Sequence, residues 1–80
     1  MRTLTLYSRE ACHLCELLIE AVLPLIRGRA GLEIVDIDSE ENLRQQFDRR
    51  VPVLCDGERV ICEAVFDRRA LLSWLTETDL

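Results

Sequence analysis

The spacing of apolar residues changes from a period of two to a helical period between residues 7 and 12. Residues 3–7, Thr-Leu-Thr-Leu-Tyr, alternate polar and apolar side chains and therefore predict a β-strand. From Cys12 onward apolar residues recur every three or four positions, which predicts an α-helix with one apolar stripe. The stripe consists of Leu14, Leu17, Leu18, Ala21, Val22 and Leu25. Residues 32–37 are rich in Ile and Val and predict a second strand, so the first half of the chain is a right-handed parallel β-α-β unit.

The second half of the chain contains signals for two helices and a hairpin. Leu43 and Phe47 share one face of a short polar helix, for which Asp38 is the expected N-cap. Residues 51–55 predict a third strand, Asp56-Gly57 a two-residue hairpin turn, and residues 59–62 the returning strand. A last helix is expected after these strands. Its N-cap is Asp67, and its buried stripe consists of Ala70, Leu71, Trp74 and Leu75.

The predicted element order is β-α-β-α-β-β-α. An α/β chain with this order forms a four-stranded mixed sheet with helices on both faces. The sequence contains no repeat and no linker rich in Pro, Gly or Ser, so we expect one domain over residues 1–80. Pro24 lies within the first predicted helix and is expected to kink or weaken it there.

Charge and composition exclude several classes of function. The net charge of −5 is unlike that of most domains that bind nucleic acid, so no nucleic-acid partner is expected. All ten basic residues are arginine, which excludes chemistry that needs a lysine nucleophile. His13 is the only histidine, which excludes sites that need two histidine ligands. The longest apolar run, residues 21–26, is too short to cross a bilayer, and we expect neither a signal peptide nor a membrane partner.

The Cys12-His13-Leu14-Cys15 motif stands where the first predicted strand gives way to a helix. The first helical turn offers unpaired N–H groups and the positive end of the helix dipole, and both favour a thiolate at Cys12. Cys15 is one turn further along and near enough to close a disulfide with Cys12. We therefore expect Cys12 to attack a substrate and Cys15 to resolve the product. The alternatives are one half of a zinc site and two inert cysteines that act as small apolar side chains.

Two basic residues flank the motif. His13 in its protonated form, and Arg9 three residues before Cys12, would each favour the thiolate electrostatically. In the alternative interpretation, both are exposed to solvent and have little effect on the cysteine.

The other two cysteines, Cys55 and Cys62, belong to the predicted hairpin. A turn at Asp56-Gly57 places Cys55 opposite Glu58 and Cys62 opposite Val51. The two cysteines are then about 13 Å apart along the strands, too far for a disulfide. Without a secretory signal, a Cys-x-x-Cys pair is more often redox-active or metal-binding than structural, and we expect a reducing, cytoplasmic compartment.

Four segments of the chain carry a family resemblance. They are residues 4–9, residues 12–15, residues 51–54 and Asp56-Gly57. Together they resemble the glutaredoxin-like branch of the thioredoxin superfamily, and the order of elements matches along nearly the whole chain. The resemblance implies a thioredoxin-like fold with sheet order 2-1-3-4. It also implies a cis peptide bond before Pro52, where the backbone of Val51 receives an extended substrate beside the Cys-x-x-Cys motif.

Three positions depart from the pattern of glutaredoxins that bind glutathione. His13-Leu14 stands in place of Pro-Tyr, Ile61-Cys62 in place of Gly-Gly, and Arg50 in place of the threonine before Val-Pro. We therefore expect weak glutathione binding. Arg49 and Arg50 are candidates to pair with a substrate carboxylate, and in the alternative they are a solvated charge pair at a helix end.

The expected function is that of a thiol–disulfide oxidoreductase, an electron carrier that uses the Cys12–Cys15 dithiol. Its substrates would be protein disulfides or glutathione adducts, with a thiol as reductant and glutathione as a candidate co-substrate. We expect a monomer without a resident metal or tightly bound cofactor. The alternatives are a binding module without turnover and a carrier that holds a metal or cluster between the Cys12 and Cys15 residues of two chains. Cys62 is either a third redox thiol at the rim of the substrate groove or a small buried strand residue.

Overall fold

The computed structural model describes residues 2–78, which form one mixed sheet and its covering helices. The elements are β1 (Arg2–Ser8), α1 (His13–Ile26), β2 (Ala30–Asp36), the short 3-10 helix η1 (Ile37–Ser39), α2 (Glu41–Phe47), β3 (Val53–Asp56), β4 (Arg59–Glu63) and α3 (Arg68–Thr78). The strand order is β2-β1-β3-β4, with β1 parallel to β2 and antiparallel to β3. The predicted element order and sheet order are both confirmed.

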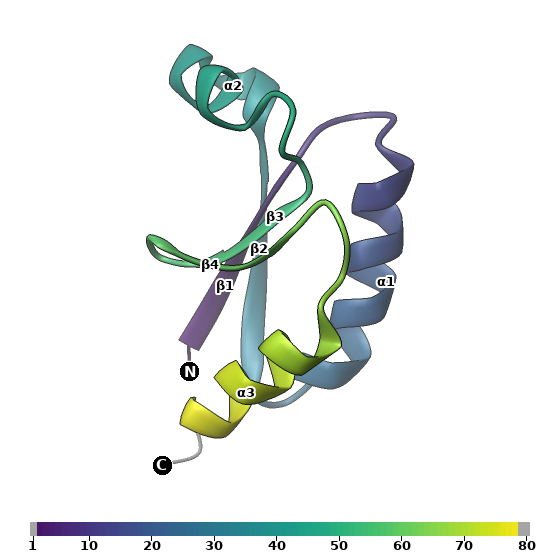
Figure 1. Ribbon diagram of the computed structural model, residues 1–80, viewed down its shortest axis with the longest axis vertical. Coiled ribbons are helices and arrows are strands. Elements are labelled where there is room, and N and C mark those ends of the chain that lie inside the picture. The colour runs from purple at the N-terminus through teal and green to yellow at the C-terminus, as the bar shows by residue number, and fades with distance from the viewer. Residues whose placement is uncertain (1, 79–80) are drawn as a thin grey trace.

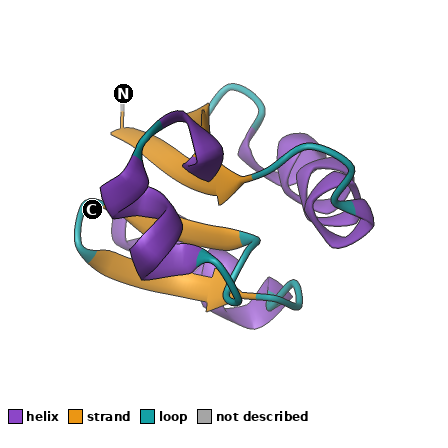
Figure 2. Ribbon diagram, turned by 90° about the horizontal axis from the view of Figure 1, so that it is seen from above, coloured by secondary structure: helices purple, strands orange, loops and turns teal. Residues whose placement is uncertain are grey.

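Helices cover both faces of the sheet because alternate residues of the central strands point to opposite sides. The larger core lies between the sheet and helices α1 and α3. It contains Leu4, Leu6, Leu18, Val22, Ile26, Ala30, Leu54, Ile61, Cys62, Leu71, Trp74 and Leu75. The smaller core lies on the α2 side and contains Ile37, Phe47, Val53 and Cys55. Figure 1 shows α2 and α3 at opposite ends of the molecule. In Figure 2 α1 lies to the right of the strands, and α2 is nearest the viewer.

The buried face of α1 is narrower than the leucine pattern predicts. Cys15, Leu18, Val22 and Ile26 are the buried residues of this helix. Leu14 and Leu17, predicted to belong to the core, are 50% and 47% exposed. Apolar side chains cover more of the helix circumference than the sheet can bury, so one edge of the stripe faces solvent. The helix continues through Pro24 to Ile26, and among residues 2–78 no helix is both long and apolar enough to cross a membrane.

The turn of the β3–β4 hairpin is one residue later than the Asp-Gly pair predicts. Asp56 pairs with Arg59, so the two loop residues are Gly57 and Glu58. Gly57 has φ +60°, the left-handed conformation that the first loop position of a type II′ turn requires and that glycine adopts without strain.

The register of the hairpin also differs from the prediction. A shift between Leu54 and Cys55 places Cys62 opposite Leu54 and Cys55 opposite Val60. The predicted pairings of Cys62 with Val51 and of Cys55 with Glu58 are therefore wrong. Cys62 belongs to the larger core, which agrees with the interpretation of a small buried strand residue.

The two predicted N-caps have different outcomes. Asp67 accepts a hydrogen bond through Oδ1 from the backbone N–H of Ala70 at 3.0 Å, which confirms it as the cap of α3. Asp38 does not cap α2. It lies within η1 and pairs with Arg9, while α2 begins after Glu40, whose side chain makes no capping bond.

Asp56 links the hairpin to α3. Its Oδ2 accepts a hydrogen bond from Nε1 of Trp74 at 2.8 Å and another from the guanidinium of Arg2. The Arg2 guanidinium also lies 4.4 Å from the centre of the Trp74 ring. The hydrogen bond from Trp74, followed by that from Arg2, holds the pKa of Asp56 below its ordinary value.

Candidate functional site

Cys12 and Cys15 form a disulfide at the amino end of α1, with their Cα atoms 5.2 Å apart. Cys12 is the N-cap residue of this helix, and its Sγ accepts a hydrogen bond from the backbone N–H of Cys15 at 3.2 Å. Cys15 is only 2% exposed, whereas Cys12 is partly exposed. The sulfur that an incoming molecule can reach is therefore that of Cys12.

The loop before Cys12 has an unusual backbone conformation. Ala11 has φ +55°, in the left-handed region that residues with a Cβ seldom occupy. The chain turns sharply at this residue, and Cys12 follows directly at the start of the helix. Such conformations are often found at functional sites, but an alanine gives no sign of them in a sequence.

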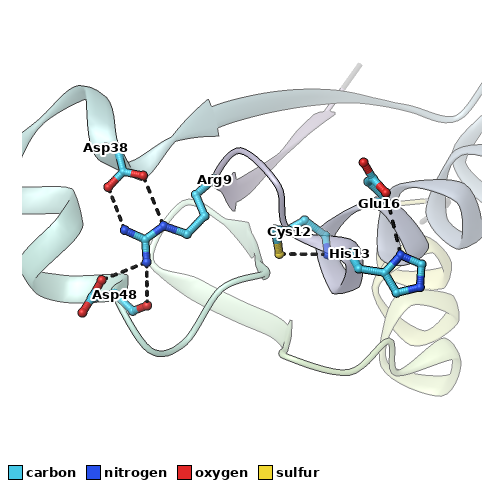
Figure 3. Close-up of a disulfide and its surroundings, with 7 residues drawn as sticks. Arg9, Cys12, His13, Glu16, Asp38 and Asp48 are labelled. Carbon is cyan, nitrogen blue, oxygen red and sulfur yellow. Dashed lines mark hydrogen bonds and ion pairs between the residues drawn. A yellow bond between two sulfur atoms is a disulfide. The ribbon is translucent and has the colours of Figure 1, made fainter.

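His13 lies on the outer surface of α1. Its Nδ1 is 3.8 Å from a carboxylate oxygen of Glu16, and the side chains of both residues are largely exposed. Figure 3 shows the imidazole ring directed toward Glu16. His13 thus follows Cys12 in the chain, but its side chain is directed toward the carboxylate of Glu16.

Arg9 connects the loop before Cys12 to the other side of the site. Its Nη2 and Nε donate to the carboxylate of Asp38 at 2.7 and 3.2 Å, and its Nη1 donates to Asp48. Figure 3 shows the guanidinium between these two carboxylates, away from Cys12. The hydrogen bonds to Asp38 and then Asp48 raise the pKa of Arg9, and the Arg9 hydrogen bond lowers that of Asp38. Arg9 therefore holds segments together and does not direct its charge at the sulfur.

Pro52 lies at the same end of the sheet as the cysteines. Tyr7 pairs with Val53, so the chain leaves β1 toward Cys12 beside the point where it enters β3. The Val51–Pro52 peptide bond is cis, and Pro52 is buried. The N–H of Val51 donates to the carbonyl of Phe47 at 3.2 Å, so in this structure that N–H is not free to meet a substrate.

A groove of about 230 Å³ runs between the first turns of α1 and the segment after β4. It is lined by Leu14, Leu17, Leu18, Ala64, Val65 and Phe66. Ala64 has φ +66°, and its N–H donates to the carbonyl of Pro52 at 2.7 Å. The groove therefore lies between the helix that carries the cysteines and a segment that is hydrogen-bonded to Pro52. The periodicity of the sequence assigned Leu14 and Leu17 to the core, and no signal in the sequence pointed to residues 64–66.

Arg50 makes an ion pair with Glu63 next to Pro52. Nε and Nη2 of Arg50 each donate to one carboxylate oxygen of Glu63 at 3.1 Å. The guanidinium also lies 5.3 Å from the centre of the Phe47 ring. The hydrogen bonds between Arg50 and Glu63 raise the pKa of Arg50 and lower the pKa of Glu63. Arg50 is thus already occupied by a carboxylate of its own chain, whereas the neighbouring Arg49 is exposed.

Cys55 and Cys62 are free thiols in separate cores, on opposite faces of the sheet. The prediction that they form no disulfide with each other is confirmed. Burial raises the pKa of both thiols, so both are protonated near neutral pH. Among residues 2–78, no three side chains of His, Cys, Asp and Glu gather where they could hold a metal ion.

The chain is similar in sequence and fold to a known family and to solved structures. The model of the Glutaredoxin-like domain (DUF836) matches residues 3–76. The crystal structure of the structural genomics target XcR50 from X. campestris is 38% identical, with a TM-score of 0.73, over 92% of this chain and 96% of that one. The solution structure of XcR50 gives a TM-score of 0.71 at the same 38% identity, over 92% of each chain.

A more distant structure shares the fold alone. It is described as a malarial protein and is 15% identical, with a TM-score of 0.60, over 98% of this chain and 97% of that one. No curated protein matches the chain.

Proposed function

The chain belongs to the family of glutaredoxin-like domains, and from this premise we propose that it is a thiol–disulfide oxidoreductase in which Cys12 attacks and Cys15 resolves. One observation carries the proposal. A disulfide joins the accessible sulfur at the N-cap of α1 to a buried sulfur in the first turn of the same helix. This arrangement lets one sulfur meet a substrate while the other remains out of solvent.

The first step is attack by the Cys12 thiolate on a substrate disulfide. In the reduced protein, the backbone N–H groups of the first helical turn stabilise negative charge on this sulfur. In the disulfide, the N–H of Cys15 already donates a hydrogen bond to it. The thiolate forms a bond to one sulfur of the substrate, and the other sulfur leaves as a thiolate. The product is a mixed disulfide on Cys12.

The second step releases the remaining half of the substrate. Cys15 gives up its proton and attacks the Cys12 sulfur, and the two Cα atoms at 5.2 Å are within the range for this bond. The second substrate thiolate leaves, so two electrons have passed from the dithiol to the substrate. The oxidised protein then needs an external thiol to reopen the bridge.

The surroundings of the disulfide support a substrate that approaches across Pro52 and the Ala64 segment. We infer that the substrates are disulfides of proteins or glutathione adducts, and that the reductant is a thiol, with glutathione as a candidate. We further propose that the protein acts as a monomer, because Cys12 and Cys15 of a single chain complete the redox disulfide. Two free thiols besides the bridge fit a reducing compartment such as the cytoplasm.

A redox titration tests the proposal. The protein is equilibrated with glutathione buffers and with thioredoxin buffers of known potential, trapped by acid and alkylation, and analysed by mass spectrometry. We expect a single two-electron transition at Cys12–Cys15 and reduction of a glutathionylated test protein in turnover assays. Cys12→Ser should abolish turnover, and Cys15→Ser should accumulate the mixed disulfide.

The alternatives give different results in the same preparation. A folded protein whose bridge exchanges with no thiol would indicate a binding module and refute the proposal. Zinc or iron that copurifies and is lost in Cys12→Ser would indicate a carrier instead. A Cys12→Ser variant with full turnover would show that another residue is the nucleophile.

A further inference from the structure

The Arg50–Glu63 ion pair joins the chain just before Pro52 to the end of β4. Arg50 stands two residues before Pro52, and Glu63 directly precedes Ala64, whose N–H donates to the Pro52 carbonyl. The pair therefore spans the hydrogen bond that joins the segment before β3 to the segment after β4. Both side chains are partly exposed, at 38% and 41%.

Two interactions link the segments next to this pair to the helix and the loop that carry the cysteines. On one side, Ala64 shares the apolar groove with Leu14, which stands between Cys12 and Cys15. On the other side, Arg9 in the loop before Cys12 donates to Asp48, two residues before Arg50. A disulfide substrate extended from Cys12 past Pro52 thus meets the Arg50–Glu63 pair.

Arg50 has the chemistry of a carboxylate receptor. A guanidinium donates two parallel hydrogen bonds to a carboxylate, and its stacking on Phe47 helps to fix the plane in which these donors point. In this structure the two donors are taken by Glu63. A substrate carboxylate would have to displace Glu63 and would then lie beside its unpaired negative charge, which is unfavourable.

We propose that Glu63 is a specificity-determining residue that makes the site discriminate against disulfides whose glutathione moiety carries a free carboxylate near Arg50. The inference rests on the proposed function, because it concerns the choice of substrate at Cys12. It also replaces the reason given by the sequence for weak glutathione binding. Ile61 and Cys62 are buried in the larger core, whereas the partly exposed Glu63 pairs with Arg50, two residues before Pro52.

The chain supplies a matched control. Arg59 and Glu77 form a second arginine–glutamate pair, with Nη2 and Oε2 2.9 Å apart and both side chains exposed. Arg59 is the first residue of β4 and Glu63 is the last, so the two pairs lie at opposite ends of one strand. Exposed ion pairs contribute little to stability, so Glu63→Gln and Glu77→Gln should both fold. Glu63→Ser is a second variant with the same loss of charge.

The experiment compares two substrates that differ at one group. One is glutathione disulfide, and the other is the disulfide of glutathione ethyl ester, in which the glycine carboxylates are esterified. Reduced protein is mixed with each disulfide under single-turnover conditions, and the rate at which the Cys12–Cys15 bridge forms is followed by acid quench and mass spectrometry. Each reaction converts one disulfide and the protein dithiol into two glutathione thiols and the protein disulfide.

We expect Glu63→Gln and Glu63→Ser to raise the ratio of the glutathione disulfide rate to the ester rate by about three- to tenfold, the effect of one unit charge in a solvent-exposed site. Glu77→Gln should leave the ratio unchanged. The double variant Arg50→Gln with Glu63→Gln should return it to the wild-type value, because the receptor is gone.

Each other outcome overturns a different statement. If Glu63→Gln and Glu77→Gln have the same ratio while wild type reacts with the ester, the role of Glu63 is refuted and the oxidoreductase proposal stands. If the double variant keeps the raised ratio, Arg50 does not receive the carboxylate, and the inference is wrong. If wild type and Glu63→Gln react with neither small disulfide but wild type reduces a protein disulfide, the inference about Glu63 is wrong and the proposed function stands. If wild type reduces no protein disulfide either, the proposed function itself fails.

Discussion

Nη1 of Arg9 donates to both the side chain and the main chain of Asp48, at 2.9 Å to Oδ1 and 3.1 Å to the carbonyl oxygen. Arg9 belongs to the loop that leads into Cys12, and Asp48 is the C-cap of α2, three residues before Val51. One guanidinium therefore connects the two segments between which the proposed substrate path runs.

Replacing Arg9 should loosen this connection. In Arg9→Gln the carboxylates of Asp38 and Asp48 lose their common partner, so we expect faster amide hydrogen exchange in residues 9–12 and 48–51 and a lower thermal unfolding midpoint. Arg9→Lys should restore little, because an ammonium cannot donate to two carboxylates and a carbonyl in the geometry of a planar fork. Exchange measured by mass spectrometry checks this. Unchanged exchange in both segments would show that packing alone holds them in place. The control is Arg44→Gln, which removes the exposed ion pair with Glu41.

Cys12 should be the thiol that reacts fastest in the reduced protein. It is the accessible one of the two helix cysteines, and the N–H groups of the helix start favour its thiolate. Burial raises the pKa of Cys55 and of Cys62, so these thiols remain protonated and slow near neutral pH. We expect iodoacetamide to label Cys12 at least about tenfold faster than any other cysteine, as a favoured thiolate predicts.

Peptide mapping after short labelling times measures this order. Cys62→Ala serves as the control and should leave the rate at Cys12 unchanged, because Cys62 faces the larger core. Labelling of Cys15 before Cys12 would contradict the assignment of the attacking and resolving sulfurs.

The order of elements and the position of the disulfide follow from local patterns in the sequence. Residues 3–7 alternate and the residues after Cys12 recur with a helical period, so the junction that carries the cysteines is visible without tertiary information. The face of α1 that meets the sheet is not visible in this way. Leu14 and Leu18 lie on the same broad apolar surface, and only packing against the sheet separates the exposed residue from the buried one.

The register of the hairpin and the ion pairs of the site depend on contacts between distant residues. The bulge near Leu54 lets both Ile61 and Cys62 enter the larger core. An Asp-Gly pair indicates a turn but does not predict such a shift in register. Arg50, in the turn before β3, pairs with Glu63, thirteen residues later at the end of β4. Sequence patterns therefore identified Arg50 as a functional candidate without showing that its charge is already paired.

Asp56 should make stability depend on pH in the acid range. Its folded-state pKa is held below the ordinary value of 3.8 by the hydrogen bonds from Trp74 and Arg2. A depressed carboxyl pKa stabilises the folded protein above the unfolded-state pKa, and this contribution is lost as the pH falls through the folded-state pKa. Unfolding midpoints measured from pH 6 down to about pH 2, where carboxyl groups titrate, should therefore fall less steeply in Asp56→Asn than in wild type. Glu58→Gln, which changes an exposed carboxylate of the turn, is the control. A decline in Asp56→Asn parallel to that of wild type would refute the assignment.

Leu17 and Leu18 are neighbours in the sequence, but their replacement should change the free energy of unfolding by very different amounts. Leu18 is 1% exposed in the larger core, so Leu18→Ala removes buried methyl groups and leaves a cavity, at a cost of about 2–5 kcal/mol in the free energy of unfolding. Leu17 is 47% exposed at the groove beside the cysteines, so Leu17→Ala should change that free energy by less than about 1 kcal/mol. Urea unfolding of the oxidised protein, followed by Trp74 fluorescence, measures both values under one set of conditions. Equal losses in the two variants would mean that the edge of the apolar stripe is buried after all, and that the groove between α1 and residues 64–66 is closed in solution.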